Sequence, residues 1–178
     1  MKTLSLLAVA LALAVAGCDT GSNPGGEKVV FSTEDNILLS GHLFGSGDVG
    51  VVLSHMRPAD QESWWPFARV LKDRGYRALA FDFRGYGGSG GELQIDHLDR
   101  DVQAAVDYIR ASGASKVFLI GASMGGTASL KVASRQEVAG VVTLSAPPAI
   151  GGLDAREDVM QVTAPKLFIA ARDDTNGF

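Results

Sequence analysis

The sequence predicts one α/β domain built on a mostly parallel sheet with helices on both faces. Three observations indicate this class. Short apolar segments alternate with longer amphipathic ones, glycine-rich or polar loops separate them, and the chemically interesting residues directly follow the apolar segments. Alternation of this kind is typical of a parallel sheet covered by helices, in which ligands bind at the carboxyl ends of the strands. We therefore expect any active site at that edge of the sheet.

The first half of this domain is expected to supply four strands. Residues 29–32 and 37–44 form a leading pair, and residues 50–54 and 76–81 are short apolar runs typical of buried strands. Between the last two, apolar residues recur at helical spacing, which predicts a helix. These residues are Trp64, Phe67, Ala68 and Leu71.

Local signals set the expected limits of that helix. Ser63 is the candidate N-terminal cap, Pro66 falls in the first turn, where proline is tolerated, and Gly75 ends the helix. A second helix is predicted to end at Gly113. Its apolar face consists of Leu98, Val102, Ala105, Val106 and Ile109.

The second half of the domain is predicted to add three strands, over residues 116–120, 138–144 and 166–171. Residues 145–163 are expected to form a loop with one small helix, because they contain two prolines and a Gly-Gly pair. A segment this short leaves little room for an elaborate lid, which favours a small, accessible substrate.

The first eighteen residues are similar to a bacterial lipoprotein signal. Lys2 supplies a positive start, residues 4–16 are apolar and uncharged, and Cys18 follows small residues. This similarity implies removal of residues 1–17 and lipid attachment at Cys18, which would anchor the protein to a membrane of the bacterial cell envelope, outside the cytoplasm. An ordinary secretory signal and a short transmembrane helix are the alternatives, although the apolar run is short for a span.

The remaining chain divides into a tether and a domain. Residues 18–27 are rich in Gly, Ser, Asn and Pro, which predicts a flexible tether, and residues 28–178 are expected to form the domain. The net charge of the 178 residues is −4, with 20% charged residues, so we expect no nucleic-acid partner. We also expect no metal and no cofactor, because the sequence has neither a metal-ligand cluster nor a dinucleotide-binding fingerprint.

The run Gly-Ala-Ser-Met-Gly at residues 121–125 has the form G-x-S-x-G, between an apolar strand and a segment, residues 127–134, that is compatible with a helix. In this arrangement the serine projects from a sharp, strained turn, so Ser123 is the candidate nucleophile. Gly121 and Gly125 are expected to be small because strand and helix approach closely there. A merely flexible glycine loop is the alternative.

Three motifs in this order resemble the α/β hydrolase family: Ser-His-Met-Arg-Pro at residues 54–58, the glycine-rich residues 82–89, and the serine motif. The resemblance extends over nearly all of residues 28–178 and is greatest to hydrolases of the dienelactone-hydrolase and serine-aminopeptidase type. It implies a serine hydrolase that cleaves an ester or similar acyl bond of a small molecule. The intermediate would be an acyl-enzyme on Ser123.

The resemblance also implies an oxyanion hole made of two backbone N–H groups. One belongs to Met124, directly after the nucleophile, and the other to Arg57, two positions after His55. Met56 stands where the family usually has glycine. His55 itself is expected to hydrogen-bond to local backbone and to take no direct part in catalysis.

Two further pairs of residues are interpreted structurally. Asp82 and Arg84 are expected to brace the glycine-rich loop beside the nucleophile and not to bind a phosphate. Trp64 is predicted to lie in the core, whereas Trp65 falls on the flank of its helix. An acyl pocket lined by these two tryptophans is the alternative.

The family's acid corresponds by position to Asp174, with Asp173 as the second candidate. Such an acid orients a histidine that follows it in the chain. All the histidines of this sequence precede the serine, at positions 42, 55 and 97. We therefore expect a C-terminally truncated hydrolase that is nearly inactive as written and whose sheet ends on an exposed apolar edge strand.

Two other readings stay open. A genuine short product would be a non-catalytic envelope lipoprotein that uses the fold as a binding module. Peptidase or cofactor-free peroxidase chemistry would keep the same serine turn.

Overall fold

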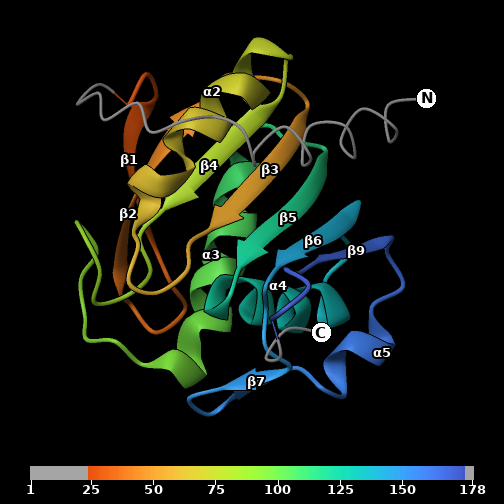
Figure 1. Ribbon diagram of the computed structural model, residues 1–178. Coiled ribbons are helices and arrows are strands. Elements are labelled where there is room, and N and C mark those ends of the chain that lie inside the picture. Colours follow the sequence, from red (N-terminus) through yellow and green to blue (C-terminus); the bar gives the residue numbers. More distant parts are fainter. Residues whose placement is uncertain (1–23, 175–178) are drawn as a thin grey trace.

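The computed structural model describes residues 24–174. The lipoprotein signal, Cys18 and most of the expected tether lie outside these residues. A seven-stranded sheet runs through the domain in the order β1-β2-β4-β3-β5-β6-β9 (Figure 1). Its strands are β1 (Glu27–Ser32), β2 (Leu38–Phe44), β3 (Val49–Ser54), β4 (Arg77–Phe81), β5 (Lys116–Ala122), β6 (Gly140–Leu144) and β9 (Lys166–Ile169).

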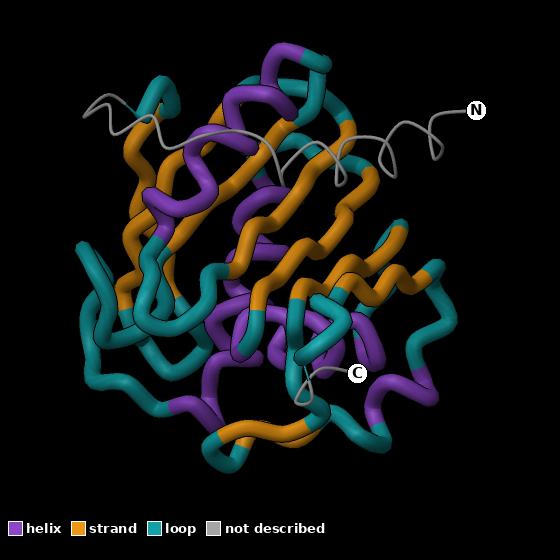
Figure 2. The backbone as a smooth tube through the Cα atoms, viewed as in Figure 1, coloured by secondary structure: helices purple, strands orange, loops and turns teal. Residues whose placement is uncertain are grey.

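The leading strands β1, β2 and β4 pair antiparallel, whereas the pairs β4–β3, β3–β5, β5–β6 and β6–β9 are parallel. Figure 2 shows these strands running side by side with loops gathered at their ends. The fold is therefore the mostly parallel sheet that the sequence predicts. The strands of the second half begin and end within a few residues of their predicted limits.

Three helices cover the sheet. In Figure 1, α2 (Trp65–Asp73) lies in front of it, and α3 (Leu98–Ala111) and α4 (Met124–Arg135) lie behind it. The predicted apolar face of α3 is confirmed, because all five of its residues are fully buried. Two short 3-10 segments, η2 (Gln61–Trp64) and η3 (Ile95–His97), precede α2 and α3.

The predicted cap of the first helix is wrong. The Asp60 carboxylate accepts the N–H of Glu62 at 2.9 Å and so caps η2, whereas the Ser63 hydroxyl donates to the carbonyl of Asp60. An extra 3-10 turn therefore comes before the helix, which itself begins at Trp65.

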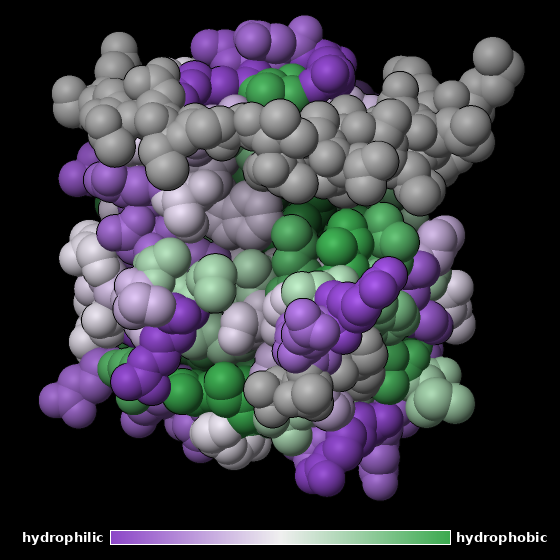
Figure 3. All heavy atoms as spheres, in the orientation of Figure 1, coloured by the Kyte–Doolittle hydropathy of each residue, from purple (hydrophilic) through white to green (hydrophobic). Residues whose placement is uncertain are grey.

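Two apolar layers hold the sheet between the helices. The layer on the α3 and α4 side includes Leu98, Val102 and Leu119, and the layer on the α2 side includes Leu53 and Leu71. On the α2 side the cover is incomplete over β5, β6 and β9, where Figure 3 shows hydrophobic side chains at the surface. The partly buried apolar residues of these strands on that side are Phe118, Ala122, Leu144, Leu167 and Ile169.

The segment after β6 contains the expected short helix, α5 (Asp158–Gln161). It also contains a small hairpin, β7 (Ala149–Ile150) and β8 (Leu153–Asp154), which the sequence analysis did not predict. The hairpin was missed because each strand has only two residues, too few to show an alternating pattern. Its turn is the Gly-Gly pair, a recognised hairpin signal.

Candidate active site

The register of the sheet places the three sequence motifs next to one another. Ser54 at the end of β3 pairs with Gly121 in β5 on one side and with Phe81 in β4 on the other. The chain leaves all three strands at the same edge, since the strands are parallel. Residues 55–58, the glycine-rich loop after β4 and the serine turn therefore form one neighbourhood, as the sequence predicts.

Ser123 lies between the last residue of β5 and the first residue of α4, with φ +48° and ψ −121°. Its N–H donates to the carbonyl of Leu144 at 2.8 Å, and its carbonyl accepts the N–H of Gly126 at 2.9 Å. The backbone is thus fixed on both sides while the residue stays half-buried. No side chain in the described part of the chain hydrogen-bonds to its hydroxyl, which leaves that group available for reaction.

The two glycines of the serine motif allow a very close approach. A Cβ atom on Gly121 would lie 2.6 Å from the nitrogen of Gly126, and one on Gly125 would lie 2.7 Å from the carbonyl oxygen of His55. Contacts this short are not tolerated, so both positions require glycine. The second contact also shows that the first turn of α4 packs directly against the backbone that leads into residues 55–58.

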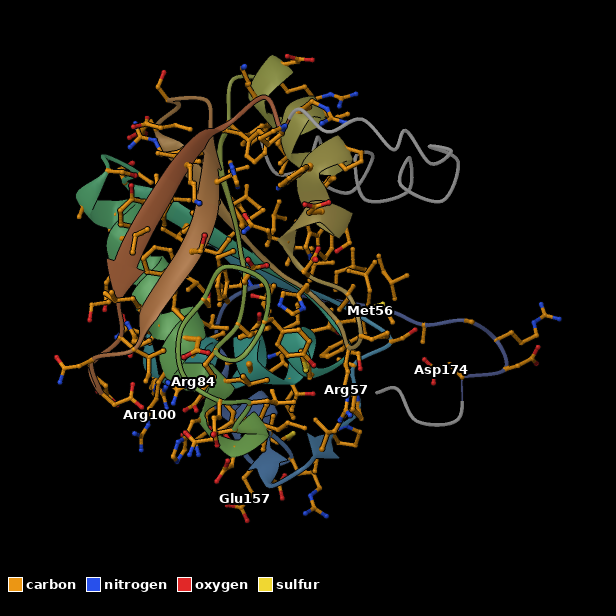
Figure 4. The ribbon with its side chains drawn as sticks, turned by 90° about the vertical axis from the view of Figure 1, so that its left-hand side faces the viewer. Met56, Arg57, Arg84, Arg100, Glu157 and Asp174 are labelled. Atoms are coloured by element: carbon orange, nitrogen blue, oxygen red, sulfur yellow. The ribbon has the colours of Figure 1, made fainter. Side chains whose placement is uncertain are left out.

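Backbone donors are available on both sides of Ser123. Met124 is the first residue of α4, so its N–H has no acceptor within the helix. Among the main-chain hydrogen bonds of residues 24–174, none uses the N–H of Arg57 as donor. Figure 4 shows Met56 and Arg57 on one side of the molecule, where both side chains are exposed. Two N–H groups of this kind can stabilise a developing oxyanion.

The His55 ring is fully buried, and both of its nitrogens are engaged. Nδ1 lies 2.9 Å from the carbonyl oxygen of Met56, and Nε2 accepts the N–H of Phe83 at 3.1 Å. Burial lowers the pKa of His55, outweighing the opposite influence of the Met56 hydrogen bond and of the charges on Asp82 and Asp60. The predicted hydrogen bond to local backbone is confirmed, and the ring bridges two loops in addition.

Asp82 braces the glycine-rich loop as predicted. Its carboxylate accepts the Nε2–H of Gln61 at 2.7 Å, the N–H of Gln61 at 3.0 Å and the N–H of Gly88 at 2.9 Å. Gln61 also hydrogen-bonds to Nδ1 of His42 at 2.8 Å. Gln61 is a bridging residue that the sequence analysis missed, since a single polar residue in a 3-10 turn as short as η2 carries no pattern of its own.

Arg84 anchors the same loop through a buried ionic network. Its guanidinium lies 2.7 Å from Asp101 and 2.8 Å from Asp35, and Arg84 and Asp101 are only 1% and 0% exposed. Burial alone would lower the pKa of Arg84, but the hydrogen bonds to these two carboxylates outweigh it and raise that pKa. Arg84 in turn holds the pKa of Asp35 well below its usual range. Asp101 lies on the apolar face of α3, one position before Val102, and a charge there signals a buried partner.

The candidate acid follows the last strand. Asp174 is half-buried, its N–H donates to the carbonyl of Ala171 at 3.0 Å, and Asp173 is exposed. Figure 4 shows Asp174 on the loop that leaves β9, on the same side of the molecule as Met56 and Arg57. This position is compatible with the predicted role, which remains a prediction.

The three histidine rings have partners of their own. His55 bridges Met56 and Phe83, Nδ1 of His42 bonds to Gln61, and Nδ1 of His97 lies 3.1 Å from the side-chain oxygen of Gln94. None of these hydrogen bonds involves the nucleophile. None of the three rings is therefore placed as a base for Ser123.

The tryptophan prediction is half right. Trp64 is buried in the core as expected, with 6% of its surface exposed. Trp65 does not lie on the flank, because it is only 8% exposed and packs edge-on against the ring of His42 with centroids 5.1 Å apart. The ring of His42 on β2 covers Trp65, so both indoles are buried although only Trp64 falls on the predicted apolar face.

Within residues 24–174, no group of three or more His, Cys, Asp or Glu side chains is arranged to hold a metal ion. No helix in the described part of the chain is both long and apolar enough to cross a membrane.

Comparison with known proteins decides the family. The family model described as "alpha/beta hydrolase fold" matches residues 50–172, more than half of the chain. The chain belongs to the α/β hydrolase fold family. Among solved structures, this family member is similar to the Pf2001 esterase of Pyrococcus furiosus, with a TM-score of 0.65 and 29% identity, over 75% of this chain and 57% of that one.

Hydrolases are also found among the related sequences. Epoxide hydrolase 3 of Xenopus tropicalis is 29% identical over 140 residues, which cover 75% of this chain and 38% of that protein. A 2-hydroxy-6-oxononadienedioate/2-hydroxy-6-oxononatrienedioate hydrolase of a Pseudomonas species is 29% identical over 134 residues, covering 72% and 47%. This α/β hydrolase chain thus spans less than half the length of these curated relatives.

Proposed function

We propose that the protein is a serine hydrolase that cleaves an ester or similar acyl bond of a small molecule through an acyl-enzyme on Ser123. The observation that supports this proposal most directly is the geometry of the turn at Ser123. The hydroxyl of this half-buried residue has no side-chain partner among the described residues, and the next residue, the first of α4, has an N–H without an acceptor in the helix. The likeness to an esterase supports acyl transfer as the reaction class.

In the proposed reaction, the Ser123 oxygen attacks the acyl carbon and gives up its proton to a base. The negative charge on the carbonyl oxygen is held by the N–H groups of Met124 and Arg57, each worth about 10²–10³ in kcat. The carbonyl then re-forms, the leaving group departs with a proton, and water hydrolyses the acyl-enzyme. Asp174 would orient the histidine that serves as base, and that histidine is not among the described residues.

We further propose a place for the protein in the cell. Lipid attached to Cys18 would hold the domain at a membrane of the bacterial envelope, outside the cytoplasm, and residues 18–27 would act as the tether. The support is the order of charged, apolar and small residues before Cys18. The proposal also keeps the dienelactone-hydrolase and serine-aminopeptidase type as the nearest subfamily, on the residues of the three motifs.

A fluorophosphonate probe, applied with and without imidazole as an added base, tests the proposed function, because it modifies activated serines. We expect intact-mass analysis to show one adduct, and peptide mapping to place it on Ser123. Ser123→Ala should abolish the adduct. Ser145→Ala, which removes an exposed serine at the end of the neighbouring strand β6, should leave it unchanged. A folded protein that the probe ignores under both conditions would favour the non-catalytic binding module instead.

A further inference from the structure

His55 makes two hydrogen bonds that can coexist in only one form of its ring. The partner of Nε2 is the N–H of Phe83, which can only donate, so Nε2 must be unprotonated. A neutral imidazole then carries its proton on Nδ1, where it is donated to the carbonyl oxygen of Met56. The ring is therefore a neutral Nδ1–H tautomer that connects the glycine-rich loop to the Met56 carbonyl.

The direction of that carbonyl determines the direction of the next N–H. The peptide between Met56 and Arg57 is trans, and in a planar trans peptide the C=O and N–H bonds point in opposite directions. Because the Met56 carbonyl points at His55 inside the protein, the N–H of Arg57 points away from the buried ring. Both residues that share this peptide, Met56 and Arg57, are exposed, whereas the ring that binds its carbonyl is buried.

We propose that His55 is a positioning residue that fixes the Met56–Arg57 peptide with its N–H turned outward as an oxyanion donor. This inference rests on the proposed function for its catalytic meaning, but the orientation of the peptide stands on hydrogen bonds alone. Released from His55, this peptide is free to rotate and turn its N–H away.

The surroundings hold the ring rigidly in this form. Phe83 and Tyr86 both contact it edge-on, with ring centroids 4.9 Å away. The glycine-rich loop that carries them is tied down by the Asp82 hydrogen bonds and by the Arg84 ionic network. The charged groups that act on the ring are Asp82 and Asp60, and Tyr86 is the other titratable neighbour.

The first test reads the tautomer directly, without activity. In a protein with isotope-labelled histidine nitrogens, long-range proton–nitrogen correlation separates the Nδ1–H, Nε2–H and doubly protonated forms. His42→Gln and His97→Gln assign the three rings. We expect His55 to be the Nδ1–H tautomer at neutral pH. An Nε2–H tautomer, or a protonated ring, would overturn the proposal.

The second test separates the two hydrogen bonds by substitution. In His55→Asn the amide nitrogen lies near the position of Nδ1 and can still donate to Met56. In His55→Gln the amide oxygen lies near the position of Nε2 and can accept from Phe83, but the donor to Met56 is lost. With imidazole added to supply the base, we expect His55→Gln to lower kcat for ester hydrolysis at least tenfold at unchanged KM, because an oxyanion donor acts mainly in the transition state. His55→Asn should retain most of the activity.

Equal kcat values for the two variants would contradict a positioning role for the Met56 hydrogen bond. His97→Gln serves as the control for replacing a histidine outside this loop. If the wild-type protein and Ser123→Ala show the same ester hydrolysis even with imidazole present, the proposed function fails, and the tautomer measurement alone then decides the orientation of the peptide.

The acid stability of the protein provides a third readout. The folded pKa of His55 lies below its ordinary value of 6.5. Above pH 6.5 neither the folded nor the unfolded state binds the proton. As the pH falls below 6.5, the unfolded state binds it first, so the free energy of unfolding decreases until the folded pKa is reached. Urea denaturation should show that the free energy of unfolding falls less below pH 6.5 in His55→Asn than in the wild-type protein. An equal fall in both proteins would count against a buried neutral ring.

Discussion

Ser123 occupies a backbone conformation that residues other than glycine seldom adopt, and such conformations cost on the order of 1–3 kcal/mol. Its neighbours maintain it. Hydrogen bonds from Ser123 to Leu144 and from Gly126 to Ser123 fix the turn, and the close packing at Gly125 fixes the loop on the other side. The positions of Ser123 and of the Arg57 N–H are thus a property of the backbone around them.

Gly125 offers a direct test of this close packing. A Cβ at this position would lie 2.7 Å from the carbonyl oxygen of His55 and closer still to that of Ser54. We expect Gly125→Ala to lower the free energy of unfolding by about 1–3 kcal/mol, a typical cost of overpacking. Gly90→Ala is the matched control, because its nearest neighbour would be the Leu38 carbonyl oxygen at 3.5 Å. If urea denaturation finds both variants equally stable, the two loops do not pack as described.

Single residues differ in how far the sequence could predict them. Gly121 and Gly125 were predictable because the serine motif itself requires close approach at those two positions. The second hydrogen bond of His55 was not, since Phe83 lies 28 residues away and only the pairing of β3 with β4 brings them together. Asp101 carried a usable signal, an acid on an apolar helix face, that was not recognised.

At the scale of elements, the Arg84 network joins three parts of the fold. Asp35 belongs to the turn between β1 and β2, Arg84 to the glycine-rich loop and Asp101 to α3. A buried ion pair of this kind is costly to break from one side, because the remaining charge stays buried without a partner. The network therefore determines where the loop lies against the helix.

Arg84→Met should lower the free energy of unfolding by about 3–5 kcal/mol, since Asp101 would keep a buried charge. The double variant Arg84→Met/Asp101→Leu should recover part of that loss. Arg156→Met breaks an exposed ion pair with Asp154 and is expected to change the thermal midpoint little. Calorimetry distinguishes these cases. Equal thermal midpoints for Arg84→Met and Arg156→Met would mean that the buried network does not stabilise the fold.

The elements themselves follow from hydrophobic periodicity where they are long. The apolar stripe of α3 and the short apolar runs of β3, β4 and β5 were sufficient to predict their type and approximate limits. The small hairpin β7–β8 and the 3-10 turn η2 were not predictable in this way, because two or four residues cannot show a period. The wrong prediction for Trp65 has another cause, because His42 of β2 covers this side chain and the helical pattern carries no information about that strand.

At the scale of the whole molecule, the sheet order brings together residues that are far apart in the sequence. Parallel pairing of β4, β3 and β5 places the chain exits near Phe81, Ser54 and Ala122 at one edge. The α2 side of β5, β6 and β9 is incompletely covered within the described residues, and Figure 3 shows the apolar side chains there. The fold class was predictable because two of its signals extend over the whole chain. These are the alternation of short apolar segments with longer amphipathic ones, and the order of the three motifs.

The most direct test of the account is to trap the acyl-enzyme. The protein is incubated with p-nitrophenyl acetate, quenched in acid and analysed by peptide mass spectrometry. Imidazole is included in a parallel sample to supply a base, because the histidine rings of this chain have other hydrogen-bond partners. We expect an acetyl group on Ser123, increased by imidazole and absent from Ser123→Ala. Acetylation that spares Ser123 under both conditions would contradict the assignment of this serine as the nucleophile.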